Sequence, residues 1–263
     1  MGDIKIGGLA GEEAGEGVPV VLLHGLTATR RYVVMGSKNL ERNGHRVVMY
    51  DARGHGASEP AGSYDYEGLA ADLLSVLDDR GIDRAVLAGA SMGAHTIARL
   101  ALEHPERTAA LVLITPAFDP DEPGRDFDRW DALSEGLRSG GVDGFLKAYG
   151  EPRVPEPFRD TVRTVVRQRL SAHQHPDAVA DALREVPRSR AFGSWEELGR
   201  LRVPVTVVAS RDEADPEHPL ATGRRYADAI PGARLESEEP GKSPLAWQGG
   251  QLSRVIAETA ARA

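Results

Sequence analysis

The chain has 263 residues and carries 32 Lys and Arg against 40 Asp and Glu, so its formal charge is −8 with histidine neutral. A net acidic chain without a dense Lys/Arg block lacks the positive surface that nucleic-acid binding requires, which argues against that class of partner. With 41% hydrophobic and 27% charged residues, the composition is that of a soluble globular protein. At this length one compact domain is expected.

Cysteine is absent, which excludes disulfides, thiolate metal sites and a cysteine nucleophile. Residues 1–17 are polar and rich in Glu and Gly, without the apolar segment of a signal peptide. No run approaches the roughly 18 apolar residues of a membrane-spanning helix. We therefore expect a cytoplasmic protein with no membrane partner.

The first half of the chain alternates short apolar, β-branched runs with amphipathic stretches, a pattern typical of a parallel α/β sheet. Strands are expected at 18–23, 46–50, 85–88 and 110–114, and helices from near Tyr32 to a cap at Gly44, at 66–77 and at 92–104. An α/β fold with helices flanking the sheet follows from this order.

After Thr115 the sequence becomes rich in Asp, Pro and Gly and then shows helical patterns up to residue 198. Continuous apolar residues return at 203–208, followed by a helix at 220–230, a strand at 233–235 and a helix at 251–261. We expect residues 118–198 to form a helical cap, inserted into a core made of residues 1–117 and 199–263.

The most informative motif is Gly89-Ala90-Ser91-Met92-Gly93, a G-x-S-x-G sequence between an expected strand and an expected helix. Glycines at these positions permit a sharp turn that holds the serine above the sheet in a strained conformation. The helix that follows offers free N–H groups and a positive dipole end to a developing oxyanion. Ser91 is therefore the predicted nucleophile.

Two further segments accompany this motif in order and spacing: His24-Gly25-Leu26, after the first long strand, and residues 51–58, which read D-x-R-G-x-G-x-S. With them the chain resembles the α/β-hydrolase superfamily, in its serine-nucleophile, esterase- and lactonase-like branch with a helical cap. The resemblance covers most of the chain outside the cap. It implies the α/β-hydrolase fold, a mostly parallel eight-stranded sheet with the site at the strand carboxyl ends.

By the same resemblance, the backbone N–H groups of Leu26 and Met92 would form an oxyanion hole. Arg53 and His55 are expected to stabilise a turn rather than to contact substrate. His24 is expected to be structural, and His45 and His104 are expected to lie on the surface.

The family order of serine, acid and histidine places the acid after the strand that ends near residue 209. Counting back from Pro219 favours Asp215, whereas counting forward from the strand favours Asp212. Asp215 is the preferred acid, and both could instead belong to a solvated acidic loop.

The histidine is where the sequence departs from the family pattern. The loop after the last expected strand reads Pro240-Gly241-Lys242-Ser243-Pro244, and no histidine follows His218. A serine hydroxyl needs a base within hydrogen-bond reach, and histidine suits this role because its pKa lies near neutrality. An ordinary triad is therefore not apparent.

Four sources of a base remain open, as does the absence of any base. His218 is our first choice, although an acid and a base on one loop are not expected to line up in series with Ser91. Lys242 stands in the place of the missing histidine but would need a strongly lowered pKa. His95 lies one helical turn after Ser91. The fourth source is a cap histidine, His173 or His175.

Other site types lack support in the sequence. His173, His175 and Asp177 do not have the spacing of a strong metal-ligand pattern, and no P-loop or G-x-G-x-x-G follows a strand. We therefore predict no metal and no cofactor. The expected function is hydrolysis of an ester, lactone or related acyl bond in a small molecule. The alternative is a non-hydrolytic lyase, isomerase or cyclase, or a binding protein, on the same fold.

Overall fold

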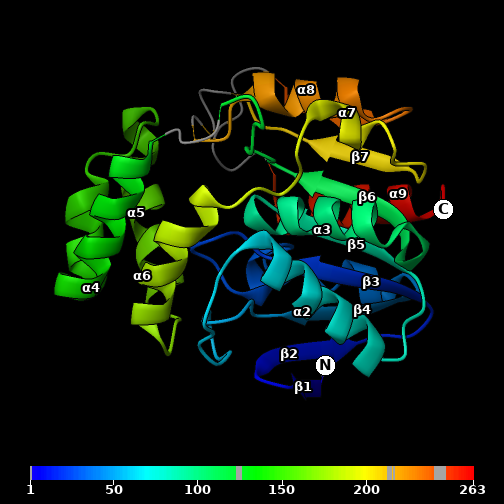
Figure 1. Cartoon of the computed structure of the whole chain (residues 1–263), viewed down its shortest axis with the longest axis horizontal. Helices are drawn as coiled ribbons and strands as arrows, with labels where there is room; N and C mark the ends of the chain where they lie inside the picture. The colour runs from blue at the N-terminus through cyan, green and yellow to red at the C-terminus, as the bar shows by residue number, and fades with distance from the viewer. Residues whose placement is uncertain (1, 123–125, 212–214, 216, 240–246) are drawn as a thin grey trace.

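The computed structural model describes the whole chain except residues 1, 123–125, 212–214, 216 and 240–246. Within the described residues, eight strands form one sheet in the order β1-β2-β4-β3-β5-β6-β7-β8 (Figure 1). The strands are β1 Gly2–Ile6, β2 Leu9–Ala14, β3 Val18–Leu23, β4 His45–Tyr50, β5 Ala85–Ala90, β6 Thr108–Ile114, β7 Val205–Val208 and β8 Arg234–Glu236. From β4 to β8 neighbouring strands pair in parallel, while β1 and β2 pair antiparallel.

The helices are α1 Asn39–Arg42, α2 Tyr66–Asp79, α3 Met92–Glu103, α4 Phe127–Tyr149, α5 Glu156–Leu170, α6 Pro176–Glu185, α7 Trp195–Leu198, α8 Leu220–Ala229 and α9 Gly249–Ala260. Short 3₁₀ segments lie at η1 Arg30–Tyr32, η2 Pro105–Arg107 and η3 Val186–Arg188. No helix within the described ranges is both long and apolar enough to cross a membrane.

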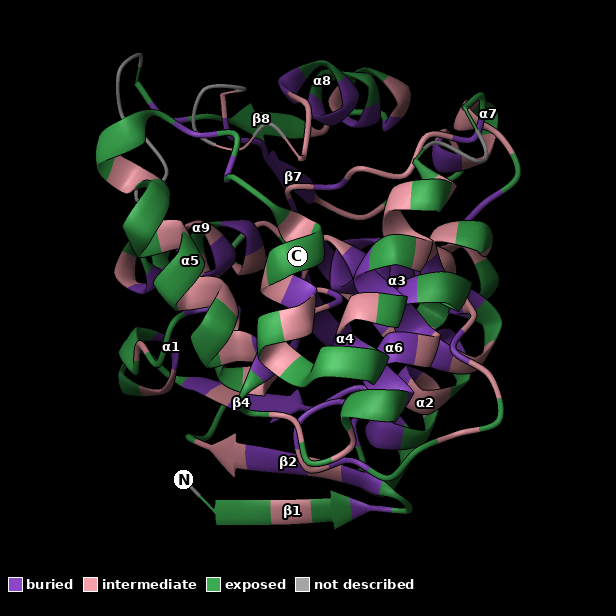
Figure 2. Cartoon of the chain, turned by 90° about the vertical axis from the view of Figure 1, so that its left-hand side faces the viewer, coloured by how far each residue is buried: buried purple, intermediate pink, exposed green. Residues whose placement is uncertain are grey.

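The sheet is covered on both faces because the central strands are apolar at every position. In β3, Val21 and Leu23 pack into the cluster formed with α2 and α3, whereas Val20 and Leu22 pack into the cluster that includes Leu252 of α9. Such continuous apolar runs are typical of parallel strands buried on both sides. Figure 2 shows the buried residues concentrated in the sheet and on the helix faces that cover it.

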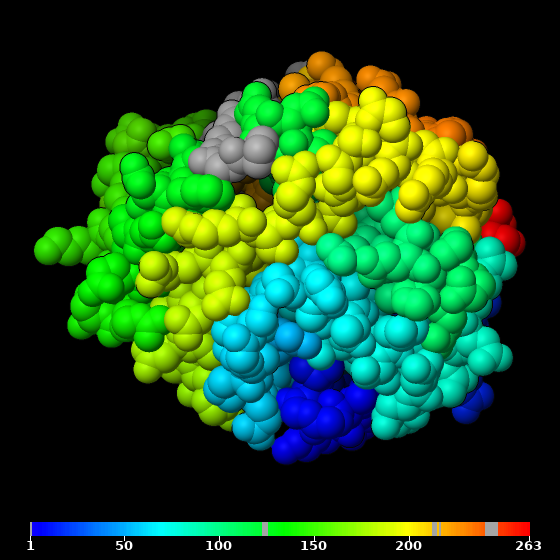
Figure 3. All heavy atoms as spheres, viewed as in Figure 1, coloured from blue at the N-terminus to red at the C-terminus, as the bar shows by residue number. Residues whose placement is uncertain are grey.

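Helices α4, α5 and α6 follow β6 and precede β7 in the sequence. Together they form a lobe, here called the helical lobe (residues 127–185). The carboxyl ends of the parallel strands point toward this lobe (Figure 1). In the space-filling view the lobe packs directly against core residues (Figure 3), and Tyr64 N–H donates to Glu185 of α6 at 2.8 Å. The strand carboxyl ends, where ligands bind in parallel sheets, therefore lie beneath the helical lobe.

Two expectations about local structure were wrong, and two strands were missed. A helix from Tyr32 is not formed: the chain turns at Met35 and Gly36, whose φ values are 46° and 73°, and only the short α1 follows. His45 is buried rather than exposed, and its Nδ1 lies 3.1 Å from the Leu40 carbonyl oxygen. Residues 1–17 were not assigned to strands from their own pattern, yet they contain β1 and β2.

Candidate active site

Ser91 sits at the turn between β5 and α3 in a backbone conformation that L-residues rarely adopt. Its φ is 49° and its ψ is −112°, and its N–H donates to the Ile114 carbonyl at 2.9 Å. Strain of this kind costs about 1–3 kcal/mol and persists where the surrounding structure holds the residue in place. The conformation directs the Ser91 side chain away from the sheet, and the residue is partly accessible.

The two flanking glycines of the motif are required by close backbone contacts. A Cβ at Gly89 would lie 2.3 Å from the carbonyl carbon of Gly93, and a Cβ at Gly93 would lie 2.4 Å from the Leu23 carbonyl oxygen. Neither separation is possible between real atoms, so any side chain would displace α3 from β3 and β5. The sequence motif is thus explained by the packing of this helix on the sheet.

The structure brings Ser91, His218 and Asp215 together. His218 Nε2 lies 3.0 Å from Ser91 Oγ, and His218 Nδ1 lies 2.9 Å from Asp215 Oδ2. Our expectation that an acid and a base on one loop could not line up with Ser91 was wrong. The His218 N–H donates to the Asp215 carbonyl at 3.2 Å, and this turn places the two side chains on the same side, with His218 between Asp215 and Ser91.

The electrostatic environment tunes both members of the pair. Burial disfavours the charged form of each, but the opposite charge and the hydrogen bond outweigh it. The pKa of His218 is therefore raised above its usual value of 6.5, and the pKa of Asp215 is lowered below 3.8. An ionised Asp215 selects the His218 tautomer with the proton on Nδ1, which leaves Nε2 free to accept the Ser91 proton.

The loop after β3 lies directly against Ser91. A Cβ built on Gly25 would lie 3.5 Å from Ser91 Cβ, and the loop closes with Ala28 N–H donating to the Gly25 carbonyl at 2.9 Å. Within the described structure, no hydrogen-bond acceptor is found for the N–H of Leu26 or of Met92, the first residue of α3. Two N–H groups beside a serine can serve as an oxyanion hole.

Three buried or partly buried histidines hold this loop. His24 accepts from Ala52 N–H at 2.9 Å, His55 Nε2 lies 2.7 Å from the Leu26 carbonyl, and His173 Nε2 lies 3.3 Å from the Thr27 carbonyl. Burial lowers the pKa of His24 and of His173 to about 3, so both are neutral. These rings serve as fixed hydrogen-bonding groups, as expected for His24 and His55.

Comparison with known proteins identifies the family of this chain. The family model described as "alpha/beta hydrolase fold" matches residues 18–242 of the chain. The chain belongs to the α/β-hydrolase family. A 2-hydroxy-6-oxononadienedioate/2-hydroxy-6-oxononatrienedioate hydrolase of Pseudomonas putida is 30% identical over 85% of this chain and 80% of its own length.

Two solved α/β-hydrolase structures are similar over almost the whole chain. A thermophilic esterase from Thermogutta terrifontis, solved with malate bound, has a TM-score of 0.81 and 27% identity, covering 98% of this chain and 97% of its own. An enol-lactonase from Burkholderia xenovorans has a TM-score of 0.75 and 25% identity, covering 99% of this chain and 97% of its own. The relatives and neighbours of this α/β-hydrolase therefore include named hydrolases and esterases.

Other candidate bases are placed differently. His95 Nε2 accepts from the N–H groups of Ala117 and Phe118 at 2.9 and 3.0 Å, and its Nδ1 lies 2.8 Å from the Tyr66 hydroxyl. Burial lowers the pKa of His95 to about 3. With both nitrogens occupied, His95 orients the chain after β6 rather than acting on Ser91.

The remaining sequence candidates do not reach the site either, or lie outside the described residues. His173 Nδ1 accepts a hydrogen bond from Gly56 N–H at 2.9 Å, and His175 is the residue before α6. Asp212 and Lys242 lie outside the described residues. Of the candidate bases that the structure describes, only His218 has a hydrogen bond to Ser91, and Asp215 is the candidate acid bonded to His218.

Arg53 stabilises a turn, as expected. Its guanidinium makes a bidentate contact with Asp72, at 2.7 and 2.8 Å, and donates to the Ser63 and Gly68 carbonyls. Four of the five N–H donors of Arg53 are therefore used by neighbouring groups in the described structure, as is appropriate for a residue that stabilises a turn.

One contact to the acid loop was not foreseen from the sequence. Arg129 of α4 makes a bidentate ion pair with Glu217, the residue before His218, with Nη2 2.8 Å from Oε1 and Nη1 in contact with Oε2. The Arg129 guanidinium also lies over the Tyr149 ring, 5.7 Å from its centre. The helical lobe thus holds the short segment that carries both Asp215 and His218.

We expect Arg129→Met to lower kcat by about three- to tenfold, because small misplacements of catalytic groups are costly. The matched control is Arg163→Met, which removes an exposed ion pair between Arg163 of α5 and Glu151. Steady-state kinetics and thermal unfolding of both variants check this expectation. Equal kcat values in the two variants would show that the Arg129–Glu217 pair does not position His218.

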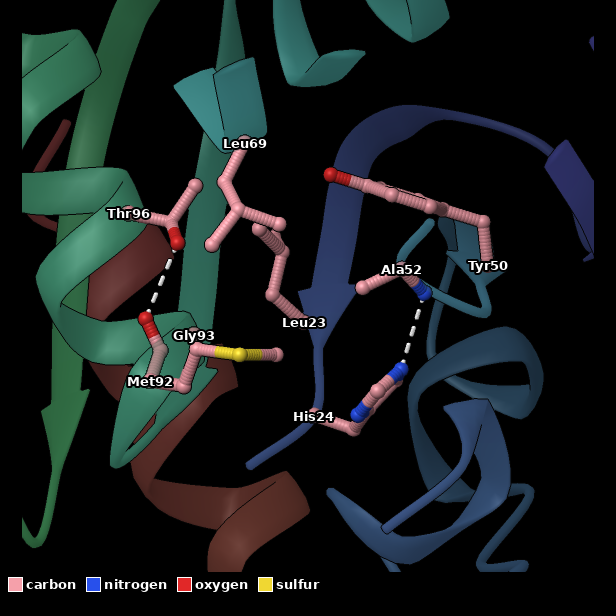
Figure 4. A pocket seen from close by; sticks show the side chains of 8 residues that line it. All are labelled: Leu23, His24, Tyr50, Ala52, Leu69, Met92, Gly93 and Thr96. Atoms are coloured by element: carbon pink, nitrogen blue, oxygen red, sulfur yellow. Dashed lines mark hydrogen bonds between the residues drawn. The ribbon is translucent and has the colours of Figure 1, made fainter. Parts of the chain in front are cut away.

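A small void lies between the first turn of α3 and strands β3 and β4, and Ser91 is not among the residues that line it (Figure 4). It measures about 10 Å³ and is lined by residues of β3, β4, α2 and α3 and of the loops that follow β3 and β4: Leu23, His24, Tyr50, Ala52, Leu69, Met92, Gly93 and Thr96. Such a volume holds about one water molecule. Thr96 Oγ donates to the Met92 carbonyl at 2.9 Å beside it. The void is too small for a substrate and belongs to the packing behind the nucleophile.

Proposed function

We propose that this α/β-hydrolase cleaves an ester, lactone or related acyl bond in a small molecule, with Ser91 as nucleophile. His218 is the general base, Asp215 orients and stabilises it, and the N–H groups of Leu26 and Met92 bind the oxyanion. No metal or cofactor takes part in this scheme.

The observation that supports the proposal best is the position of His218, 3.0 Å from Ser91 Oγ and 2.9 Å from Asp215 Oδ2. Nε2 takes the proton as Ser91 Oγ attacks the acyl carbon, and Asp215 stabilises the imidazolium that forms. The negative charge on the carbonyl oxygen is stabilised by the N–H of Leu26, in the loop after β3, and by the N–H of Met92, at the positive end of the α3 dipole.

The first half of the reaction ends when the imidazolium of His218 gives its proton to the leaving oxygen, and the acyl group remains on Ser91. In the second half, a water molecule loses a proton to His218 Nε2 and attacks the acyl carbon. The bond from the acyl carbon to Ser91 Oγ then breaks, His218 returns its proton to Oγ, and the acid is released. The helical lobe, within the expected cap of residues 118–198, would cover this chemistry and shape the pocket.

The choice of an ester or lactone rests in part on relatives named esterase and enol-lactonase. The non-hydrolytic alternative was motivated by the missing histidine after β8. The contact of His218 Nε2 with Ser91 Oγ supports hydrolysis over this alternative, because it offers the base that the missing histidine would have supplied.

We expect a fluorophosphonate probe to label the wild-type protein once per chain, at Ser91, because the probe reacts with a serine that a neighbouring base activates. Peptide mapping by mass spectrometry identifies the site. Ser91→Ala should not be labelled, and the control Ser75→Ala, on the exposed side of α2, should be labelled like wild type.

Turnover of short p-nitrophenyl esters by the same three proteins completes the test. An initial burst or steady turnover in wild type and Ser75→Ala, absent in Ser91→Ala, is the expected result. If the probe leaves Ser91 unmodified and no ester is hydrolysed faster than by Ser91→Ala, the acyl-enzyme mechanism is excluded.

A further inference from the structure

Arg169, in the last turn of α5, carries a charge that the described residues do not neutralise by an ion pair. Most arginines of the helical lobe have such a partner. The pairs are Arg129 with Glu217, Arg138 with Asp181, Arg163 with Glu151, Arg167 with Asp143 and Arg184 with Asp131. Within the described structure no carboxylate lies within ion-pair distance of Arg169, which distinguishes it from these surface residues.

Arg169 is partly buried, and the inner part of its guanidinium is withdrawn from solvent. It lies over the Tyr32 ring, 5.1 Å from the ring centre, and its Nε is buried without a hydrogen-bond partner. Burial lowers its pKa. A desolvated charge with an unused donor is unfavourable unless an anion compensates it. The two Nη atoms of Arg169 are not among its buried atoms and have no hydrogen-bond partner in the described structure, so they can bind a carboxylate through two parallel hydrogen bonds.

The position of Arg169 is next to the triad. Tyr32 is the last residue of η1, the short 3₁₀ segment that follows the loop beside Ser91. His173, four residues after Arg169, contacts the Thr27 carbonyl in that loop. The positive charge of Arg169 favours the ionised form of Asp215 and disfavours the protonated form of His218. Arg169 therefore lies on the lobe side of the site, between the loop after β3 and the acid loop.

We propose that Arg169 binds a carboxylate of the substrate while Ser91 attacks an ester or lactone carbonyl of the same molecule. This inference rests on the proposed function and specifies its substrate class as carboxylate-bearing esters or lactones. A chain with a net charge of −8 repels anions in general, so a local cation at the site is needed to hold such a substrate.

The kinetic test compares two esters that differ only in charge: the p-nitrophenyl monoester of glutaric acid and its neutral methyl-capped diester. In wild type the anionic ester should have the lower KM. Arg169→Met should raise the KM for the anionic ester about 10- to 100-fold and change that for the neutral ester less than about twofold. Arg169→Lys should restore part of the preference. Rates are compared on the alkaline plateau, where a change in the His218 pKa has no effect.

Binding of glutarate, measured by calorimetry on Ser91→Ala, gives a readout that needs no turnover. The affinity should fall at least about tenfold when Arg169→Met is added, and should be unchanged by the control Arg163→Met. The assignment of Arg169 would be overturned if Arg169→Met raised KM equally for both esters or left the affinity for glutarate unchanged. Either result would leave the Ser91 mechanism intact. If Ser91 is neither labelled nor active but glutarate binding still depends on Arg169, the proposed function fails and the anion site stands.

Discussion

Replacement of His218 by alanine should lower kcat by about 10⁴-fold or more, the loss that removal of a triad histidine causes in serine hydrolases. The physical reason is that the described residues then offer Ser91 Oγ no side-chain acceptor for its proton, since His218 Nε2, 3.0 Å away, is the one that they provide. Labelling of Ser91 by a fluorophosphonate should be lost in parallel. Steady-state kinetics with a p-nitrophenyl ester and intact-mass measurement check both effects.

Two further variants make the assignment of His218 specific. His104→Asn changes a histidine with a side-chain exposure of 41%, and should behave like wild type. Lys242→Ala removes the residue that stands where the family pattern has its histidine, and should also keep its activity. A large loss in Lys242→Ala together with an active His218→Ala would transfer the role of base from His218 to Lys242. Circular dichroism of each variant separates loss of chemistry from loss of fold.

The elements that the sequence predicted well are those whose signals are local. The apolar runs of β3, β5 and β6 and the periodicity of α2 and α3 depend only on residues within each segment. Ser91 was predicted for the same reason, because the glycine spacing and the strand-to-helix change all lie within a few residues. For these segments, local preference and tertiary packing agree.

The elements that were missed depend on distant partners. Glu12 in β2 is only 1% exposed, yet it reads as a surface residue because its partners, Arg30 and Arg31, lie beyond β3. A helix was expected from near Tyr32, but Val33 and Val34, which follow it, are buried against the core in a turn instead. A pattern in one segment cannot show that an apolar or charged group is satisfied by another segment.

The candidate base was predicted only as one choice among several, for a related reason. The spacing of Asp215 and His218 is visible in the sequence, but the turn that places both side chains on one side is not. The partner of His218, Ser91, is 127 residues earlier in the chain. The Arg129–Glu217 pair that holds this loop joins segments 88 residues apart.

Asp215→Asn should lower kcat by about 10⁴-fold while leaving the protein folded. An asparagine can present its amide N–H to His218 Nδ1, which would then act as an acceptor and place the ring proton on Nε2. In that tautomer Nε2 cannot take the proton of Ser91. The variant could thus keep a hydrogen bond of about the same length as the 2.9 Å bond between His218 and Asp215, although the reaction has lost its base.

The pH dependence of kcat/KM separates this effect from a structural defect, because it should shift in one particular direction. In wild type, kcat/KM should rise with pH through a value above 6.5, because the pKa of His218 is raised and only its neutral form accepts a proton. Burial lowers that pKa and the charge of Asp215 raises it, so Asp215→Asn should move the acid limb to lower pH. A limb that stays in place, with a wild-type rate on the plateau, would exclude Asp215 and return Asp212 as the candidate acid.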